Sequence, residues 1–247
     1  ALTNCFKNDG RLIYIGAGTS GRIGLMDAVE CYPTFSCSPE MVQALMAGGD
    51  NAMIKAVEGA EDNEQMAIDQ LKAININSND CIIGIAASGR TPYTVSALKY
   101  AKKIGATTGC ITTSKDSPLA KTAKYPVEAI TGSEVVMGST RLKSGTAQKL
   151  ICNMITTASM IKLGKTYSNL LIEMMPTNEK VQERCKNVLI EALDVTYEEA
   201  SLLLDKYGSM KYAIFSKLSG IEDIEEIKRL LSLTKGNIRE SLKLINM

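Results

Sequence analysis

Residues 11–22 decide the fold, and they read Arg11-Leu-Ile-Tyr-Ile-Gly-Ala-Gly-Thr-Ser-Gly-Arg22. The segment from Arg11 to Ile15 is short, mostly apolar and rich in residues that favour a strand. A glycine-rich turn follows it, and Ile23 to Val29 then has the pattern of a helix. We therefore expect a strand, a turn and a helix in direct succession, which is the beginning of a βαβ unit.

The same order recurs about 70 residues further along the chain. Cys81 to Ile85 is apolar and predicts a strand, and the turn Ala86-Ala-Ser-Gly-Arg-Thr91 follows it. Pro92 stands where a helix can begin, and the helical pattern continues to about Lys103. Both segments share an apolar strand, a Ser-Gly-Arg turn and a helix, so we interpret them as a loose internal repeat.

Further strands are expected at residues 41–45, 107–113 and 126–130, and further helices at residues 52–57, 63–71 and 147–161. Strands that alternate with helices indicate a mostly parallel sheet flanked by helices on both faces. The composition changes at residues 175–178, and the pattern beyond is helical, with a capping box at Thr196. We therefore predict a three-layer α/β domain over residues 1–178 and a small C-terminal helical bundle over residues 179–247, which we interpret as a packing or dimerisation appendage.

The composition argues against several classes of protein. Lys and Arg total 28 and Asp and Glu total 27, so there is no basic excess for contacts to nucleic-acid phosphates. No apolar run approaches the roughly 20 residues that span a bilayer, and no signal-peptide pattern is visible. The seven cysteines form no Cys-x-x-Cys pair, which argues against zinc and favours reduced thiols in a cytoplasmic protein. Histidine is absent, so acid–base chemistry falls to Glu, Asp, Lys, Tyr or Cys.

The first turn carries two competing signals. Gly16-x-Gly18-x-x-Gly21 matches the fingerprint of dinucleotide-binding proteins. However, no acidic residue closes a second strand about 20 residues further on, where a ribose hydroxyl would be held, because Asp50 comes late. Thr19 and Ser20 place hydroxyls beside the backbone N–H groups of a helix N-terminus, and this combination suits a phosphate monoester.

The second turn, residues 88–91, repeats these hydroxyls at another helix start. Two such turns on neighbouring parallel strands would face one crevice at the carboxyl ends of the strands, which favours a sugar-phosphate pocket. Taken alone, either turn is as typical of a helix N-cap without a ligand as it is of a phosphate-binding turn. The polar, cationic stretch from Thr131 to Thr146, which contains Lys143, could close over an anionic ligand or be an exposed connection.

Carboxylates near this crevice are candidate acids and bases. Glu30 lies about three turns along the first helix. Residues 57–62 read Val-Glu-Gly-Ala-Glu-Asp and supply three carboxylates around a glycine. Taken by itself, this acidic run is more typical of a solvated helix end than of a site.

Several motifs together resemble the N-acetylmuramic acid 6-phosphate etherases, which belong to the sugar isomerase (SIS) domain proteins. These motifs are the segments at residues 11–22, 27–31, 57–62, 85–92 and 138–149. Several of them are not general to SIS domains, so the resemblance is specific. It extends from about Arg11 to the C-terminus, where Thr177-Asn-Glu-Lys180 also fits the family.

The resemblance implies a lyase that cleaves the D-lactyl ether of N-acetylmuramic acid 6-phosphate to N-acetylglucosamine 6-phosphate and D-lactate, in recycling of bacterial peptidoglycan. It implies Glu30 and Glu61 as the catalytic residues. We hypothesise that Glu61 removes the C2 proton and that Glu30 protonates the oxygen of the leaving lactate. A homodimer is implied, and neither a cofactor nor a metal is.

The expected substrate contacts lie in the two turns and in the stretch before the long helix: Gly18, Thr19, Ser20, Ser88, Gly89, Arg90, Thr91 and Lys143. Many sugar-phosphate isomerases of the wider family carry a serine two residues before the position of Ser88. This chain has Ala86 there, so one phosphate contact is missing or supplied elsewhere.

Three alternative functions remain open. A SIS-type regulator would bind a sugar phosphate without turnover, as the related glucokinase regulatory proteins do, although those carry two SIS domains and this chain is long enough for one. An aldose–ketose isomerase would use the same phosphate turns with a different base. A dinucleotide-dependent oxidoreductase rests on the glycine fingerprint alone.

Overall fold

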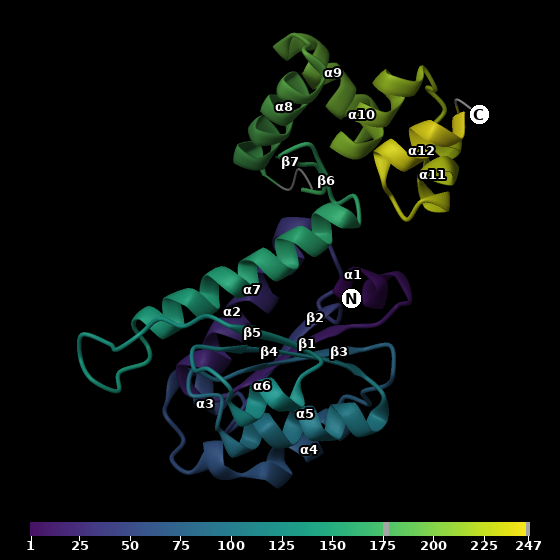
Figure 1. The fold of residues 1–247 in the computed structure, drawn as a ribbon. Coiled ribbons are helices and arrows are strands. Elements are labelled where there is room, and N and C mark those ends of the chain that lie inside the picture. The colour runs from purple at the N-terminus through teal and green to yellow at the C-terminus, as the bar shows by residue number, and fades with distance from the viewer. Residues whose placement is uncertain (175–177, 246–247) are drawn as a thin grey trace. The chain divides into compact units, whose positions relative to one another are not determined.

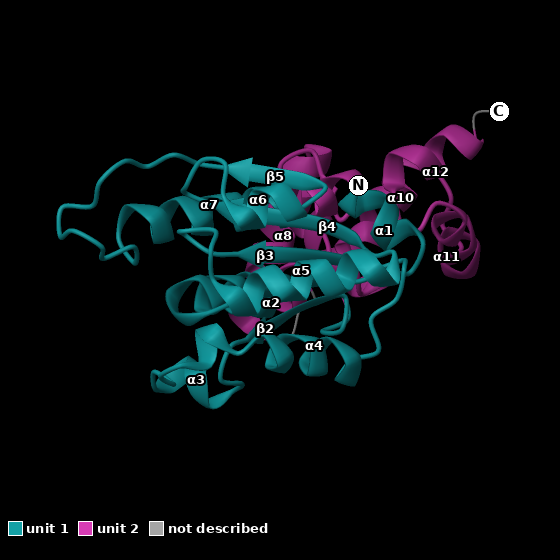
Figure 2. Cartoon of the chain, turned by 60° about the horizontal axis from the view of Figure 1, so that its bottom comes forward, with its two compact units in different colours: residues 1–31, 38–156 teal, residues 32–37, 157–247 magenta. Residues whose placement is uncertain are grey.

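The computed structural model describes residues 1–174 and 178–245. The chain divides into two compact units, shown in separate colours in Figure 2. Unit 1 contains residues 1–31 and 38–156, and unit 2 contains residues 32–37 and 157–247. The domain boundary predicted at residues 178 and 179 stays a prediction, because the composition change and the Thr177 motif behind it involve residues 175–177, which lie outside the described residues.

Unit 1 is built on a parallel sheet that has, among the described residues, five strands in the order β2-β1-β3-β4-β5. The strands are β1 (Leu12–Gly16), β2 (Val42–Met46), β3 (Cys81–Ile85), β4 (Thr107–Thr112) and β5 (Tyr125–Glu128). The chain passes from β1 to β2 and then returns to the other side of β1 as β3. The strand order therefore reverses between β1 and β3, and such a reversal leaves a crevice at the carboxyl ends of the strands.

Helices cover both faces of this sheet, as Figure 1 shows. They are α1 (Leu2–Lys7), α2 (Gly18–Phe35), α3 (Asn51–Ile54), α4 (Glu64–Ala73), α5 (Pro92–Ile104), α6 (Pro118–Thr122) and α7 (Lys143–Lys162). Ile13 and Ile15 of β1 pack in one core with Leu71 of α4 and Leu98 of α5. The intervening Tyr14 lies on the opposite face, as the alternation of side chains along a strand requires. The predicted α/β fold with helices on both faces is confirmed.

A buried polar network fixes α2 beside α7 on the second face. The carboxylate of Asp27 accepts hydrogen bonds from the Tyr14 hydroxyl at 2.9 Å, the Asn153 amide at 2.7 Å and the Thr156 hydroxyl at 3.2 Å. Burial, with the charges of Cys152 and Asp27 nearby, raises the pKa of Tyr14 well above its ordinary value. The phenol therefore stays protonated and remains a donor, so the network is satisfied at neutral pH.

Unit 2 is mainly helical. Its helices beyond residue 178 are α8 (Glu179–Leu193), α9 (Tyr197–Tyr207), α10 (Met210–Ser219), α11 (Ile224–Leu233) and α12 (Ile238–Ile245). The Thr196 hydroxyl accepts the backbone N–H of Glu199 and caps α9, and Gly208 ends that helix with a φ of 62°. A short hairpin of β6 (Thr166–Tyr167) and β7 (Leu170–Leu171) was not expected from the sequence. The C-terminal helices are confirmed, and within the described residues no helix is both long and apolar enough to cross a bilayer.

The helix expected over residues 52–57 is wrong, because α3 ends at Ile54. Lys55 adopts an extended conformation with a φ of −121° and a ψ of 138°. Gly59 then takes a φ of 71° and opens the short 3-10 helix η1 (Ala60–Asp62). The Ile54 side chain is 86% exposed, so little apolar burial supports a longer helix here. This turn, rather than a helix, carries the acidic residues 58–62.

A buried ion pair joins the starts of β1 and β3, and its loss is expected to weaken the fold. The Asp80 carboxylate is fully buried and accepts the Arg11 guanidinium at 2.7 and 3.1 Å. Burial alone raises the pKa of Asp80, but hydrogen bonds from Arg11 and from the Asn77 N–H outweigh it and hold the pKa below 3.8. We expect Asp80→Asn to lower the free energy of unfolding by about 3 kcal/mol at pH 7.

The pH dependence of this loss follows from the sign of the shift. A carboxylate whose pKa is lowered on folding stabilises the protein above its unfolded pKa and stops doing so as the pH falls through its folded pKa. The free energy of unfolding, measured with urea, should therefore differ between wild type and Asp80→Asn by a constant amount above about pH 5. This difference should shrink below about pH 4. Asp205→Asn, which changes an exposed carboxylate of α9, is the matched control. A loss that stays equally large at pH 3 would contradict this account.

Candidate functional site

The two hydroxyl-bearing turns lie side by side at the crevice between β1 and β3. Gly16 and Ile85, the last residues of these strands, are direct partners in the parallel register. Each turn follows its strand at once, so both emerge at the same edge of the sheet. The juxtaposition that the sequence predicted is thereby confirmed.

Packing explains the glycines of the first turn. A Cβ at Gly21 would stand 2.6 Å from the carbonyl oxygen of Gly16, and Gly18 has a φ of 54°. Only glycine allows α2 to begin this close to the end of β1. The N–H groups of the first turn of α2 have no partner within the helix itself, so the turn offers donors to an anion as a phosphate-binding turn does.

The Thr19 methyl group and the Ser20 hydroxyl of the first turn face α7. A Cβ at Gly145 would lie 3.5 Å from the Thr19 methyl group, so the start of α7 packs closely on the start of α2. The Ser20 hydroxyl donates to Oε1 of Gln148 at 2.9 Å. Gln148 is 1% exposed, whereas Thr19 and Ser20 are half-buried. Helix α7 is therefore part of the wall that surrounds the first turn.

The second turn is anchored by hydroxyl groups that follow β4. The side chains of Thr112, Thr113 and Ser114 each lie 3.1 Å from the carbonyl oxygen of Ala87. Gly89 has a φ of 60°, and a Cβ there would meet Ser117 Oγ at 2.2 Å. The Ser88 hydroxyl oxygen accepts the N–H of Arg90 at 3.2 Å, and Thr91 precedes α5. Arg90 is exposed at this edge, and Ser88 is exposed as well.

A carboxylate from the stretch before α7 sits on the N-terminus of that helix. Glu134 accepts the backbone N–H groups of Lys143 and Ser144 at 3.0 and 2.9 Å. The hydrogen bond from the Ser144 N–H contributes most to lowering the pKa of Glu134, and slight burial opposes this effect. The Lys143 ammonium donates to the Thr131 carbonyl oxygen at 2.8 Å. In this state both side chains therefore bind the chain's own backbone.

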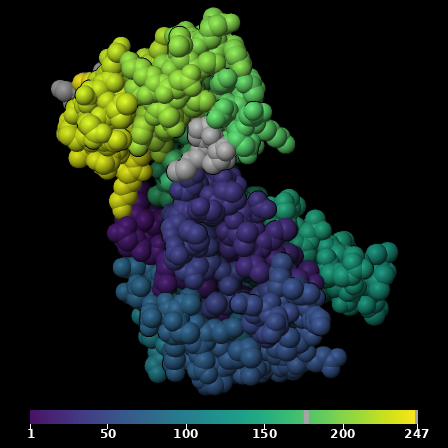
Figure 3. Space-filling view, turned by 180° about the vertical axis from the view of Figure 1, so that it is seen from behind, coloured from purple at the N-terminus to yellow at the C-terminus, as the bar shows by residue number. Residues whose placement is uncertain are grey.

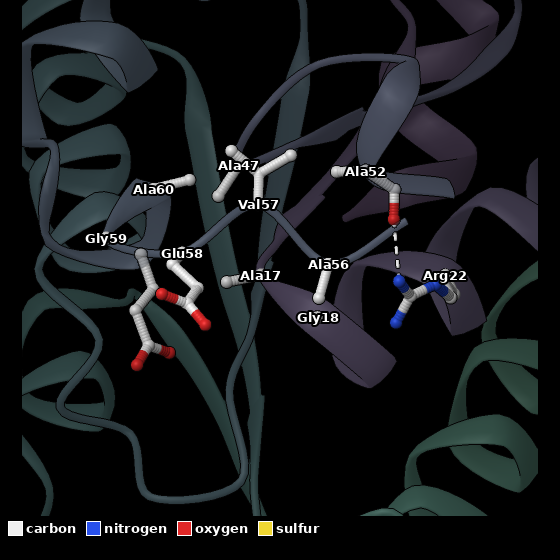
Figure 4. A pocket seen from close by; sticks show the side chains of 11 residues that line it. Ala17, Gly18, Arg22, Ala47, Ala52, Ala56, Val57, Glu58, Gly59 and Ala60 are labelled. Atoms are coloured by element: carbon white, nitrogen blue, oxygen red, sulfur yellow. Dashed lines mark hydrogen bonds between the residues drawn. The ribbon is translucent and has the colours of Figure 1, made fainter. Parts of the chain in front are cut away.

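Glu61 lines a hollow of about 280 Å³ beside the first turn, together with Ala17, Gly18, Arg22 and Glu58. Figure 4 shows Glu58 on one side of it and the Arg22 guanidinium on the other. Arg22 donates to the carbonyl oxygens of Ala52 at 2.7 Å and Met53 at 3.0 Å, which ties the segment after β2 to α2. That segment is blue in Figure 3 and lies at the surface of unit 1. The wall that carries Glu61 is thus exposed, and it is anchored by Ala60, which is buried in the core of unit 1.

Glu30 lines a second and more apolar hollow of about 380 Å³, on α2. Its other lining residues are Thr19, Arg22, Ile23, Leu25, Met26, Val29 and Met53. Met26 and Val29 are 42% and 60% exposed. Gly18 lines the hollow of Glu61, Thr19 lines that of Glu30, and Arg22 lines both. Glu61 therefore lies beside the first turn of α2, whereas Glu30 lies about three turns further along the helix, in a hollow that extends back to Thr19.

The sequences of known proteins show which family the chain belongs to. It is 53% identical over 239 residues to the N-acetylmuramic acid 6-phosphate etherase of Geobacillus thermodenitrificans, covering 96% of this chain and 81% of that protein. It is 50% identical over 238 residues to the corresponding protein of Exiguobacterium, with the same coverage. The chain belongs to the N-acetylmuramic acid 6-phosphate etherase family. The resemblance seen in the sequence motifs is confirmed.

Family models and solved structures agree with the SIS fold of this etherase family member. The glucokinase regulatory protein N-terminal SIS domain matches residues 1–102, and the SIS domain matches residues 57–158. A solved structure of an E. coli CFT073 protein has a TM-score of 0.51 at 22% identity, covering 68% of this chain and 77% of that one. A phosphoheptose isomerase from Francisella tularensis has a TM-score of 0.50 at 20% identity, covering 65% and 81%. At these identities the structures show the fold alone.

The structure brings together some of the predicted site residues of the etherase family member. Gly18, Thr19 and Ser20 lie beside the turn of residues 88–91, whereas Glu30 and Glu61 line separate hollows. Their roles stay predictions, as does that of Lys143. Arg22 and Gln148 were not among the predicted site residues. Arg22 stood within the quoted turn, so its charge was a usable signal. Gln148 lies within the family motif at residues 138–149, but nothing in that motif indicates a contact to Ser20.

Proposed function

We propose that this chain cleaves the D-lactyl ether of N-acetylmuramic acid 6-phosphate, giving N-acetylglucosamine 6-phosphate and D-lactate, as a cytoplasmic enzyme of peptidoglycan amino-sugar recycling. The observation that carries the proposal is the identity of 50–53% over 96% of the chain to proteins named for this activity. The adjacent hydroxyl turns at the β1–β3 crevice support it, because they provide a place for the 6-phosphate. The nearby carboxylates supply acid–base chemistry without histidine.

The proposed reaction is an elimination followed by addition of water. Opening of the sugar ring exposes the C1 aldehyde, which acidifies the C2 proton. Glu61 removes this proton, a C2–C3 double bond forms, and the bond from C3 to the lactyl oxygen breaks. Glu30 delivers a proton to that oxygen as lactate leaves. Water then adds its hydroxyl to C3 and a proton returns to C2, so the net reaction consumes one water molecule.

The phosphate is proposed to lie on the two turns. The free N–H groups at the start of α2 and the side chains of Thr19 and Ser20 supply donors on one side, and residues 88–91 supply them on the other. Lys143 is the proposed additional cation, which would exchange its contact with the Thr131 carbonyl oxygen for the ligand. This placement sets the sugar beside the hollow of Glu61 and at the end of the hollow that runs along α2 from Thr19 to Glu30.

The deciding experiment incubates the purified chain with N-acetylmuramic acid 6-phosphate in deuterium oxide. We expect equal amounts of D-lactate and N-acetylglucosamine 6-phosphate, with deuterium at C2 of the sugar product. A regulator of the SIS type would bind the sugar phosphate and release no lactate. An isomerase would interconvert aldose and ketose phosphates and leave the ether intact. Either of these results would overturn the proposal.

We further propose that the active form is a homodimer that covers the apolar faces of α2 and α7. Met26 and Val29 on α2 are 42% and 60% exposed, and Leu150 and Met154 on α7 are 54% and 60% exposed. The bonds of Asp27 to α7 show that these two helices lie side by side, so the exposed side chains belong to one region. Contiguous apolar surface of this kind typically marks a protein interface.

The dimer is tested by sedimentation velocity at micromolar concentration. We expect the wild type to sediment as a dimer and Leu150→Glu combined with Met154→Glu to sediment as a monomer, because buried unpaired carboxylates would oppose association. Leu202→Glu, at a 69% exposed position on α9, is the control and should leave the dimer intact. A wild-type chain that is monomeric at these concentrations would contradict the prediction.

A further inference from the structure

Gln148 presents an unusual combination of one satisfied and one unsatisfied amide atom. Its Oε1 accepts the hydroxyl proton of Ser20 at 2.9 Å, across 128 residues of sequence. Its Nε2 is buried and has no hydrogen-bond partner among the described residues. A buried amide donor without a partner is unfavourable, and such groups in native proteins call for a reason.

The same bond limits what Ser20 can do. A serine hydroxyl carries one proton, and a phosphate dianion can only accept hydrogen bonds. While Ser20 donates its proton to Oε1 of Gln148, it has none to donate to a phosphate on the first turn of α2. The arrangement in the structure is therefore suited to the state without ligand.

Rotation of the Gln148 amide by about 180° would give the donor a partner and release the Ser20 proton. It would leave Oε1 without a partner instead, and an unpartnered carbonyl oxygen is more common in proteins than an unpartnered N–H group. The rotation exchanges the positions of Oε1 and Nε2, so Nε2 would donate to Ser20 Oγ and gain the partner that it lacks. The Ser20 proton would then be released toward the ligand side of the turn. Gln148 is 1% exposed and held on α7, so water does not compete for either atom.

We propose that Gln148 is a positioning residue that switches Ser20 between these two states, turning the hydroxyl into a phosphate donor when a sugar 6-phosphate binds. This inference rests on the proposed function only in placing the phosphate at the first turn. It assigns to α7 a role in phosphate affinity and none in the proton transfers. Substitution of Gln148 should therefore change phosphate affinity only when Ser20 is present.

A double-mutant cycle tests this dependence, with N-acetylglucosamine 6-phosphate as the probe and its dissociation constant measured by calorimetry. In Gln148→Glu the side chain keeps its length but can only accept, so it holds the Ser20 proton permanently. We expect Ser20→Ala and Gln148→Glu each to weaken binding about tenfold, as loss of one hydrogen bond to a charged group does. The double variant should bind within about twofold of Ser20→Ala alone.

The cycle also separates positioning from simple charge repulsion. A carboxylate that acted by its charge would weaken binding in the Ser20→Ala background as well, and such additive losses would overturn the proposal. Unchanged binding in either single variant would overturn it too. Lactate release by the wild type is measured separately, so that a failed etherase proposal and a failed switch are distinguishable.

A second measurement keeps the proposal testable if Gln148→Glu does not fold. In nitrogen-15 spectra of the wild type, the side-chain amide of Gln148 is assigned by its absence in Gln148→Met. We expect its signals to shift on saturation with N-acetylglucosamine 6-phosphate, because Nε2 gains an acceptor, and to stay in place with N-acetylglucosamine at the same concentration. An amide signal that does not respond to the phosphorylated sugar would overturn the switch.

Discussion

Glu61→Gln should reduce lactate release about 10³-fold, within the range that removal of a general acid or base produces, and should also abolish deuterium incorporation at C2. Glutamine keeps the size of the side chain and removes its basicity. Because proton removal from C2 precedes every later step, both readouts should fall together. Lactate release is followed with a D-lactate dehydrogenase assay, and deuterium is followed by mass spectrometry of the sugar product.

Glu58→Gln is the matched control for this experiment. Glu58 lines the same hollow as Glu61, carries the same charge and lies three residues away. It has no part in the proposed mechanism, so its variant should keep lactate release within about threefold of wild type. If Glu58→Gln lost activity and Glu61→Gln kept it, the base would be misassigned although the hollow would still be the site.

The fold was predictable because its decisive signals are local. Apolar strands followed by glycine turns and helix starts indicate a parallel sheet, and the chirality of βαβ units limits how such strands can neighbour one another. The predicted pairing of the two turns therefore held, with Gly16 opposite Ile85. The helix predicted over residues 52–57 is wrong because its apolar side chains have no core to pack on, and Ile54 is left 86% exposed.

The site was predictable only in part, for a physical reason. Thr19, Ser20 and residues 88–91 follow strand ends directly, so the topology fixes where they lie. The contact from Ser20 to Gln148 depends instead on how α7 crosses α2, which is set by packing such as that of Gly145 on Thr19. In the same way, the placement of Glu61 depends on long-range packing, because its neighbour Ala60 is buried in one core with Leu71 of α4 and Leu98 of α5. No spacing in the sequence encodes either arrangement.

Glu30→Gln should separate the two halves of the reaction. Glu30 is proposed to act after the C2 proton has left, so its loss should lower lactate release about 10²- to 10³-fold. Deuterium exchange at C2 of N-acetylglucosamine 6-phosphate, which needs only Glu61, should continue within about threefold of the wild-type rate. Glu40→Gln, at an exposed position after α2, is the charge-matched control and should leave both rates unchanged.

The pattern across the two variants carries more information than either rate alone. Loss of exchange in Glu30→Gln together with its retention in Glu61→Gln would exchange the roles of the two carboxylates. Full lactate release by Glu30→Gln would remove it from the mechanism. Because Glu30 and Glu61 line separate hollows that share Arg22, mixing the two variant chains then tests whether they act within one subunit. If Glu30 of one subunit serves the Glu61 site of the other, the mixture should recover up to about a quarter of wild-type activity. Half of the dimers would then contain one chain of each variant, and each of these would hold one intact site out of two.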